Sequence, residues 1–382
     1  MVRRVPLLAV AVLAACATAS TGAAAPTRAA PSTRAAPRME VALQDDPAFV
    51  SELTLGRGKA LKLASRLHVT RIRVNLPWRS IVDHANSKRR PKHRHYDFTS
   101  YDALFNAAAR HGIKLQVTIS GPAPRWATGD GKKGNYKVRL ADYEHFVRGV
   151  AKHFRHHIDR YSIWNEPNYR SWNSPLKGNA ERYRKMYVAA YKIIRHYDAT
   201  AKILIGETSP YGKKGESTSP VTFLREVTKH GKLKADGYAH HPYDYVHGPH
   251  WPSPHDANAS ISQLDNLTEE LDKLAKQGKL TTRAGKPLDV YLTEFGYMRK
   301  GRYKKPTTKR ANYLRDAFEI ALRNPRVREM TQYGLAPPPP YSKHWDMSIV
   351  TRKGKPTKVF KTLAAWTDEQ AEAHTIALPA PR

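Results

Sequence analysis

The chain has 382 residues, of which 40% are hydrophobic and 26% charged, a single cysteine, and a formal net charge of +32. One cysteine excludes an intrachain disulfide, so stability must come from a hydrophobic core, for which the length is sufficient. The positive charge favours binding of polyanions such as an acidic polysaccharide, or it serves solubility and retention at a cell surface. Because the basic residues are scattered and not interleaved with aromatics on one face, we expect no nucleic-acid partner.

The N-terminal residues have the pattern of an export signal. Arg3 and Arg4 precede an apolar run over residues 5–15, which is too short to cross a membrane. We therefore expect residues 1–25 to be a signal peptide, and the protein to be secreted or extracellular.

Two ends are possible for this signal. Leu13-Ala14-Ala15-Cys16 resembles a bacterial lipobox, in which Cys16 would carry a lipid anchor on the outer face of the membrane, whereas Ala23-Ala24-Ala25 fits ordinary cleavage. We favour the lipobox because the only cysteine falls at the end of the apolar run. Residues 17–38, rich in Ala, Thr and Pro, then form a tether or a discarded leader.

Strand-like and helical segments alternate from residue 39 to residue 370, which favours βα units and a parallel sheet. No glycine-rich phosphate loop follows the first strand, so an open nucleotide-binding sheet is disfavoured. We predict an α/β protein, a (β/α)8 TIM barrel, as one catalytic domain over residues 39–370, with a C-terminal tail over 371–382. The expected strands are 39–43, 71–76, 114–119, 161–165, 202–206, 237–241, 290–294 and 328–333.

Two glutamates stand at the ends of predicted strands. Glu166 lies in Trp-Asn-Glu-Pro-Asn after the fourth strand, and Glu294 in Leu-Thr-Glu-Phe-Gly at the end of the seventh. In a barrel, both would open on the C-terminal rim, where active sites of this fold lie. Glycoside hydrolysis needs two such carboxylates, one that transfers a proton and one that attacks or stabilises the sugar carbon.

With these residues placed, the chain resembles the clan A glycoside hydrolases, and the two glutamate segments are similar to those of families 39 and 5. The resemblance implies a retaining enzyme with Glu166 as acid/base and Glu294 as nucleophile. It also implies that Asn165 bonds the sugar 2-hydroxyl and that Arg73, on the second strand, bonds Glu294. Arg73 lies between Ile and Val on its strand, which favours an inward position.

Further contacts follow from the same resemblance. Tyr243 is expected against the nucleophile, His241 as a sugar contact, and Trp126 as a stacking surface. The clan often has a tryptophan at the end of strand eight, where this chain has Gln-Tyr-Gly, so we assign that place to Trp345. Glu207, after strand five, is a third carboxylate near the rim, for which we expect an accessory role. Trp78 and Trp172, also near strand ends, are further candidates for stacking on a sugar ring.

The histidines at 240, 241, 247, 250 and 255 do not repeat a metal-binding spacing, so we predict no metal and no cofactor. The expected partner is a carbohydrate substrate, with an anionic polysaccharide as one class, and the expected state is a monomer. A non-catalytic carbohydrate- or cell-wall-binding barrel stays open as the alternative. The sequence does not name the sugar, because fold does not fix substrate.

Overall fold

The structure, a computed structural model, describes residues 38–340 and 345–381, which form one compact unit. The expected signal peptide over residues 1–25, the lipobox at Cys16 and the expected tether over residues 17–38, apart from Arg38, lie outside these residues. In the described part of the chain, no helix has the length and apolar character that crossing a membrane requires.

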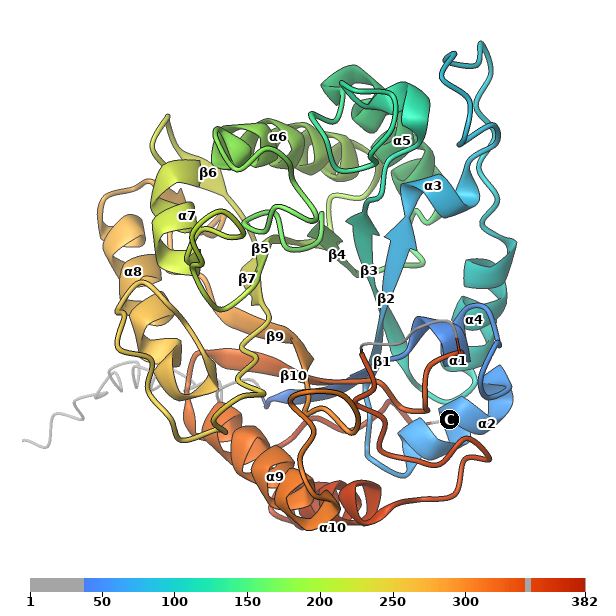
Figure 1. Cartoon of the computed structure of the whole chain (residues 1–382), viewed down its shortest axis with the longest axis vertical. Helices are drawn as coiled ribbons and strands as arrows, with labels where there is room; N and C mark the ends of the chain where they lie inside the picture. Colours follow the sequence, from blue (N-terminus) through green and yellow to red (C-terminus); the bar gives the residue numbers. More distant parts are fainter. Residues whose placement is uncertain (1–37, 341–344, 382) are drawn as a thin grey trace, which may run out of the picture. The chain divides into compact units, whose positions relative to one another are not determined.

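Eight parallel strands close into a barrel at the centre of the molecule, with helices outside it (Figure 1). Each strand pairs in parallel with both neighbours, in the order β1-β10-β9-β7-β5-β4-β3-β2. The predicted TIM barrel is thereby confirmed, and every barrel strand begins and ends within two residues of its predicted bounds. The strands are β1 (Glu40–Gln44), β2 (Arg71–Pro77), β3 (Lys114–Ser120), β4 (Arg160–Ile163), β5 (Lys202–Thr208), β7 (Gly237–His240), β9 (Val290–Phe295) and β10 (Val327–Tyr333).

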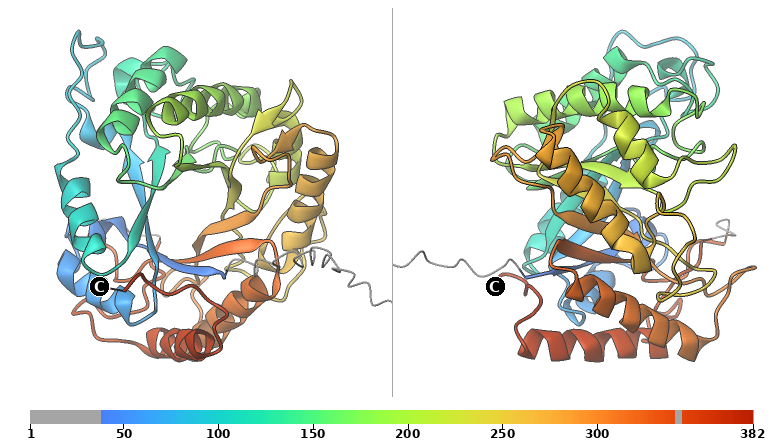
Figure 2. Two further views of the ribbon diagram at one scale, coloured as in Figure 1. Left: turned by 180° about the vertical axis from the view of Figure 1, so that it is seen from behind. Right: turned by 90° about the vertical axis from the view of Figure 1, so that its left-hand side faces the viewer.

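The helices outside the barrel each bury part of their surface, most of them against the strands or a neighbouring helix. In α5 (Leu140–His153) the buried side chains include Tyr143, Phe146 and Val150, and their spacing of three and four residues places them on one side of the helix. The helices α9 (Thr307–Arg323) and α10 (Lys358–Glu372) lie side by side in both views of Figure 2. The other helices are α1 (Asp46–Phe49), α2 (Arg57–Ser65), α3 (Trp78–Ile81), α4 (Thr99–Ala109), α6 (Asn179–Tyr197), α7 (Pro220–Val227), α8 (Leu264–Lys276), α9 (Thr307–Arg323) and α10 (Lys358–Glu372).

Two features were not predicted from the sequence. A second sheet pairs β6 (Leu233–Lys234) with β8 (Leu280–Thr281), strands of two residues that carry no recognisable alternation. The segment after α10 packs against the barrel: Ile376 is buried and forms a bridge with Met39, and the N–H of Ala377 donates to the Met39 carbonyl. The C-terminal residues thus cover the start of β1.

Candidate active site

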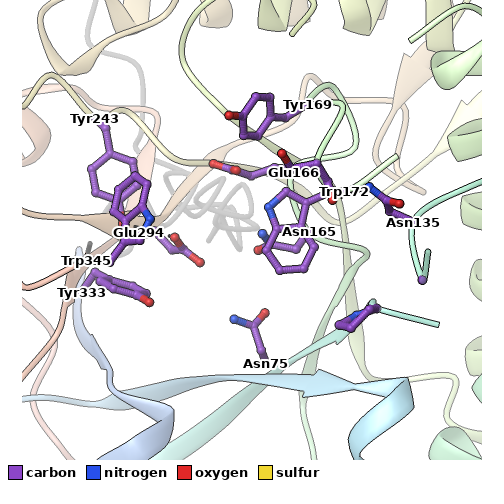
Figure 3. Close-up of a pocket in the computed structure, with 13 residues that line it drawn as sticks. Asn75, Asn135, Asn165, Glu166, Tyr169, Trp172, Tyr243, Glu294, Tyr333 and Trp345 are labelled. Carbon is purple, nitrogen blue, oxygen red and sulfur yellow. Dashed lines mark hydrogen bonds between the residues drawn. The ribbon is translucent and has the colours of Figure 1, made fainter. Parts of the chain in front are cut away.

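A cavity with a volume of about 640 Å³ opens at the C-terminal ends of the barrel strands (Figure 3). In Figure 3 the side chains of Glu294, Asn75 and Tyr333 point into the same space, and Glu166 lies beside Tyr169 at its edge. We call this space the first cavity. Its lining residues are Asn75, Pro122, Gly134, Asn135, Asn165, Glu166, Tyr169, Ser171, Trp172, Tyr243, Glu294, Tyr333 and Trp345.

Glu294 lies within β9, and its carboxylate is held from two sides. Arg73, on β2, donates from Nη1 to Oε1 at 2.6 Å, and the Tyr243 hydroxyl donates to Oε2 at 3.2 Å. A guanidinium is always charged, so one oxygen has a permanent cation beside it. The structure thus brings Arg73 and Tyr243 to Glu294, the carboxylate that the resemblance pairs with both residues.

Glu166 follows β4 in a turn with unusual backbone angles. The strand ends at Ile163, two residues earlier than predicted, and Trp164 and Glu166 have φ values of 63° and 37°. Such left-handed conformations in residues other than glycine are uncommon and gather at functional sites. The turn is held by Trp164, whose indole N–H donates to the Trp172 carbonyl at 2.9 Å, and it leaves the Glu166 carboxylate at the cavity.

His241 lies behind the two glutamates and does not line the cavity. Its Nδ1 is 3.2 Å from Glu166 Oε1 and 3.7 Å from Glu294 Oε2, so those two oxygens are at most about 7 Å apart. Burial alone would lower the pKa of His241, but the charge of Glu294 and the bonds to Glu166 and Glu207 raise it to about 10. The ring is therefore an imidazolium among carboxylates. The resemblance implies a sugar contact for His241, and the structure buries this residue completely, outside the lining of the cavity.

Glu207 is completely buried at the end of β5 and also lies outside the cavity lining. It accepts from Arg73 Nη2 at 2.8 Å, from the Thr293 hydroxyl at 3.0 Å and from His241 Nε2 at 2.6 Å. Burial alone would raise the pKa of Glu207, but the charge of Arg73 and the bond from His241 lower it to about 2. This carboxylate therefore holds the two cations in place instead of meeting a ligand.

Asn165 lies at the cavity, and its side-chain oxygen accepts from Arg73 Nη2 at 3.1 Å. With the oxygen so engaged, the amide nitrogen is the group left to donate toward a ligand. No hydrogen bond from that nitrogen to another protein group is recorded among the described residues. Arg73 thus bonds both Asn165 and Glu294.

Of the two tryptophans predicted to bind substrate, Trp345 lies at the cavity and Trp126 does not. Trp345 lines the cavity and is 48% exposed, whereas Trp126 is 1% exposed and packs edge-on against Trp78, with ring centroids 5.6 Å apart. The structure therefore does not bring Trp126 to the cavity, because the aromatic core beneath α3 holds its ring. Trp172, from the loop after β4, lines the cavity instead.

Sequence reasoning missed several residues at this cavity. Asn75 stands two residues after Arg73 on β2, and residues two apart share a face of a strand, so alternation could have identified it. Tyr333 ends β10. At this place the sequence showed only that the tryptophan common in the clan is absent. Asn135 and Tyr169 come from loops, and nothing in the local sequence places them at the cavity. Within residues 38–340 and 345–381, no group of three or more His, Cys, Asp or Glu is arranged to hold a metal ion.

A closed barrel of eight parallel strands with two glutamates on one cavity at its C-terminal rim defines a TIM-barrel glycoside hydrolase. The model of the cellulase family, glycosyl hydrolase family 5, matches residues 56–324. The chain belongs to this family. No curated protein sequence matches the chain.

Solved structures of glycoside hydrolases, among them members of family 39, share the fold. A family 39 glycoside hydrolase from the gut symbiont Bacteroides cellulosilyticus WH2 is similar with a TM-score of 0.66 and 16% identity, over 87% of this chain and 64% of that one. A glucosidase from Croceicoccus marinus has a TM-score of 0.63 and 13% identity, over 87% and 67%. Thermotoga maritima Cel5A has a TM-score of 0.56 and 13% identity, over 85% and 96%. The chain thus spans less than two thirds of the first of these.

Proposed function

We propose that the protein is a retaining O-glycosidase that cleaves a poly- or oligosaccharide by double displacement. The observation that carries this proposal is the pair Glu166 and Glu294, whose carboxylates face one cavity with oxygens no more than about 7 Å apart. Retaining enzymes have carboxyls ~5 to 5.5 Å apart and inverting enzymes ~6.5 to 9.5 Å apart. The limit applies to one pair of oxygens and is compatible with the retaining separation, so the stereochemistry of the product decides between the two mechanisms.

In the first step, Glu294 attacks the anomeric carbon and the bond to the leaving oxygen breaks as Glu166 gives that oxygen a proton. The product is a glycosyl ester on Glu294. In the second step, Glu166 takes a proton from a water molecule, which attacks the same carbon and releases Glu294. Each step inverts the anomeric centre once, so the configuration is retained.

The neighbouring residues support these roles. Arg73 and Tyr243 hold the attacking carboxylate, and both of its oxygens are fixed in direction. The amide nitrogen of Asn165 would donate to the sugar 2-hydroxyl, a contact that strengthens in the transition state; its support is that Arg73 already engages the side-chain oxygen. Trp172, Tyr333 and the exposed Trp345 offer ring faces on which the apolar face of a sugar can stack.

We further propose that the protein acts outside the cell. The support is the signal-like pattern over residues 1–25, with Cys16 as the residue that a lipid anchor would occupy. A formal charge of +32 would favour retention at an anionic surface or polymer.

The test is covalent capture. A 2-deoxy-2-fluoro glycoside of a sugar that the enzyme accepts should form a stable ester, which peptide mass spectrometry would locate at Glu294. The variant Glu294→Gln should lose both labelling and turnover. Capture at another residue, or undiminished turnover by Glu294→Gln, would contradict the assignment.

Product analysis separates the enzyme from a binding protein. NMR of the fresh product should show the anomeric configuration of the substrate. Inverted product would overturn the retaining mechanism. Sugar binding without turnover, over neutral and acidic β-linked oligosaccharides and bacterial surface polymers, would favour a non-catalytic barrel instead.

A further inference from the structure

Two loops beside the first cavity form a surface that the proposed chemistry does not use. The first loop, residues 83–97, connects α3 to α4, and the second loop, residues 128–139, leads into α5. In Figure 1 the first loop stands out from the barrel beyond α3. Lys133 in the second loop is followed by Gly134 and Asn135, which line the first cavity. The surface therefore begins at the edge of that cavity.

The two loops lie far apart in the sequence, and Arg125 joins them in the structure. Its backbone N–H donates to the Ala85 carbonyl in the first loop at 2.9 Å, and its Nε donates to the Gly131 carbonyl in the second loop at 2.8 Å. The first loop also contacts α5, where the Tyr96 hydroxyl lies 3.0 Å from His145 Nδ1. The loops and the start of α5 thus form one continuous surface.

This surface is rich in basic residues. The two loops contain nine Lys or Arg, against three Asp and no Glu. The buried Asp142 at the start of α5 is shared by two cations of the first loop, since Arg90 and Arg94 lie 3.2 and 3.8 Å from the same oxygen. The net charge of the surface is therefore positive.

Five of these cations are free to meet an anion. Their charged groups make no ion pair, hydrogen bond or ring contact with the described part of the chain, and all five side chains are exposed. We call them the basic face: Lys88, Arg89, Lys92, Lys132 and Lys133. Because these side chains have no protein partner, an anion that binds them does not have to displace one.

The neighbouring helix responds to the positive charge. Burial lowers the pKa of His145 on α5, and the charges of Arg94 and Arg148 lower it further, although Asp142 acts in the opposite direction. The cations thus outweigh the nearest carboxylate at this histidine. A positive potential extends from the first loop over the start of α5.

A second basic stretch, residues 299–310, is more fully engaged by the protein. Arg299 is paired with Asp346 at 2.5 Å, and Arg310 is buried. Lys305 donates to the Val246 carbonyl at 2.7 Å. This stretch therefore offers fewer free cations than the basic face.

The surface favours a polymer of acidic sugars over other polyanions. The exposed large hydrophobic side chains of the described residues are Leu53, Val246, Tyr303, Trp345 and Leu378, none of which lies in the two loops. The loops therefore offer no exposed ring for the bases of a single-stranded nucleic acid and no apolar group that could enter a membrane. They also lack the helix or β-ribbon that enters a DNA groove. The cavity that they border is a sugar site in the proposed function.

We propose that the basic face binds an acidic polysaccharide, a flexible chain whose sugars carry carboxylates, and holds the protein at this polymer. A chain of repeated charges can contact several of the five side chains at once, so that individually weak contacts add up. Each contact is exposed and is therefore screened by salt. Binding at this face needs neither Glu166 nor Glu294, so it goes beyond the proposed glycosidase function and does not depend on it.

The binding test compares two polymers of equal length and different charge. Labelled polygalacturonate and its carboxyl-reduced, neutral form are titrated with the protein, and fluorescence anisotropy gives Kd for each. At low salt, the acidic polymer should bind about tenfold or more tightly than the neutral one. This difference should vanish in ~1 M salt, where the Debye length is ~3 Å.

A charge-removal variant tests the residues of the basic face. Replacing all five by Gln should raise Kd for polygalacturonate at low salt about tenfold or more and should flatten its dependence on salt. The matched control replaces five exposed lysines that are scattered over the molecule, has the same net charge and should keep the Kd of the native protein. These lysines are Lys62, Lys192, Lys232, Lys276 and Lys361.

Thermal unfolding checks that the variants keep the fold, and all three proteins should have the same Tm. A smaller variant, Lys132→Gln with Lys133→Gln, keeps the test decisive if the five-residue variant does not fold. It should also weaken binding of polygalacturonate, by less than the five-residue variant does, and an unchanged Kd would contradict the proposal.

The possible failures are distinct. Equal binding of the acidic and the neutral polymer would overturn the proposal, and an equal rise of Kd in the control variant would assign the binding to overall charge. Tighter binding of a duplex DNA with the same number of charges, lost in the five-residue variant, would assign the face to nucleic acid instead. Turnover of a neutral oligosaccharide should be the same in the native protein and the five-residue variant. Its absence in both would overturn the glycosidase function and leave the polymer binding intact.

Discussion

The imidazole of His241 bridges two glutamates, with Nε2 2.6 Å from Glu207 and Nδ1 3.2 Å from Glu166. Ionised carboxylates only accept hydrogen bonds, and a neutral imidazole has a single N–H. In the state where both glutamates are ionised, before Glu166 takes up the proton that it donates in the first step, both bonds can form only when the ring is protonated, which agrees with a pKa of His241 raised to about 10. The ring thus links the buried Glu207 to the proposed proton donor.

The variant His241→Gln should lose stability in a pH-dependent way. A raised pKa in the folded protein means that protonation stabilises the fold. This stabilisation is complete below the ordinary histidine value of 6.5 and is lost as the pH rises through about 10. The difference in free energy of unfolding between native protein and variant, from urea titrations, should therefore be largest near pH 6 and shrink toward pH 10.

The adjacent histidine offers a matched control. His240 is equally buried, but burial lowers its pKa to about 4, so it stays neutral across this range. The difference between native protein and His240→Gln should not shrink toward pH 10: it should rise between pH 6 and pH 7, where the unfolded histidine loses its proton, and stay constant above. Parallel behaviour of the two variants would contradict the charged state of His241.

Replacement of Glu166 by Ala should slow substrates according to their leaving group. A poor leaving group such as a sugar hydroxyl needs the proton that Glu166 supplies, so kcat/KM should fall by about 10²- to 10⁴-fold. The dinitrophenolate of a dinitrophenyl glycoside leaves as a stable anion without a proton. The rate of the glycosylation step should therefore fall much less with this substrate. Steady-state and burst kinetics on both substrates would measure this.

Glu226→Ala is the control, because Glu226 is exposed on α7 and 3.8 Å from Lys229. It should leave both substrates unaffected. A loss of the same size on the two substrates in Glu166→Ala would mean that Glu166 is not the proton donor.

The barrel and the two glutamates could be predicted because their signals are local. The strands are short apolar runs, and Pro167 and Gly296 stop regular pairing just after each glutamate. The alternation of side chains along β2 was enough to predict that Arg73 points into the barrel. The order of strands then put residues more than a hundred positions apart on one rim, as the fold requires.

The remaining residues depend on contacts between distant segments. Trp126 and Trp172 both follow barrel strands, but only packing against Trp78 decides that the first ring turns into the core. Likewise, His241 is drawn behind the cavity because strands β5 and β9 bring Glu207 and Glu294 around it. Such positions follow from three-dimensional neighbours, and no spacing in the sequence records them.

Arg73→Lys should impair the chemical step. The guanidinium donates to Glu294, Glu207 and Asn165 at 2.6, 2.8 and 3.1 Å, and a single ammonium cannot reproduce this planar set of directions. With the attacking carboxylate less well held, kcat should fall by about 10²-fold, the usual effect of losing one preorganised donor. A rise in KM with unchanged kcat would instead assign Arg73 to uniform substrate binding.

Arg160 is buried at the start of β4, at the end of the barrel opposite the cavity. Its Nη1 lies 2.6 Å from Glu40 and also bonds Glu329. Arg160→Met would leave these carboxylates with one cation fewer. Removing one partner of a buried ion pair costs about 3 to 5 kcal/mol. We expect a loss of this size in the free energy of unfolding at pH 7, with kcat of the folded protein unchanged.

The double variant Arg160→Met with Glu329→Gln separates charge from packing. Burial raises the pKa of Glu329, despite the charge of Arg160, so its neutral replacement costs less than an unpaired anion. Burial alone would raise the pKa of Glu40 too, but the charges of Arg160 and Arg71 lower it to about 2. The ionised Glu40 therefore stabilises the fold above pH 4.5, and this stabilisation is lost as the pH falls toward 2. The double variant should therefore recover part of the lost stability at pH 7. A double variant less stable than Arg160→Met alone would show that packing, not unpaired charge, sets the cost.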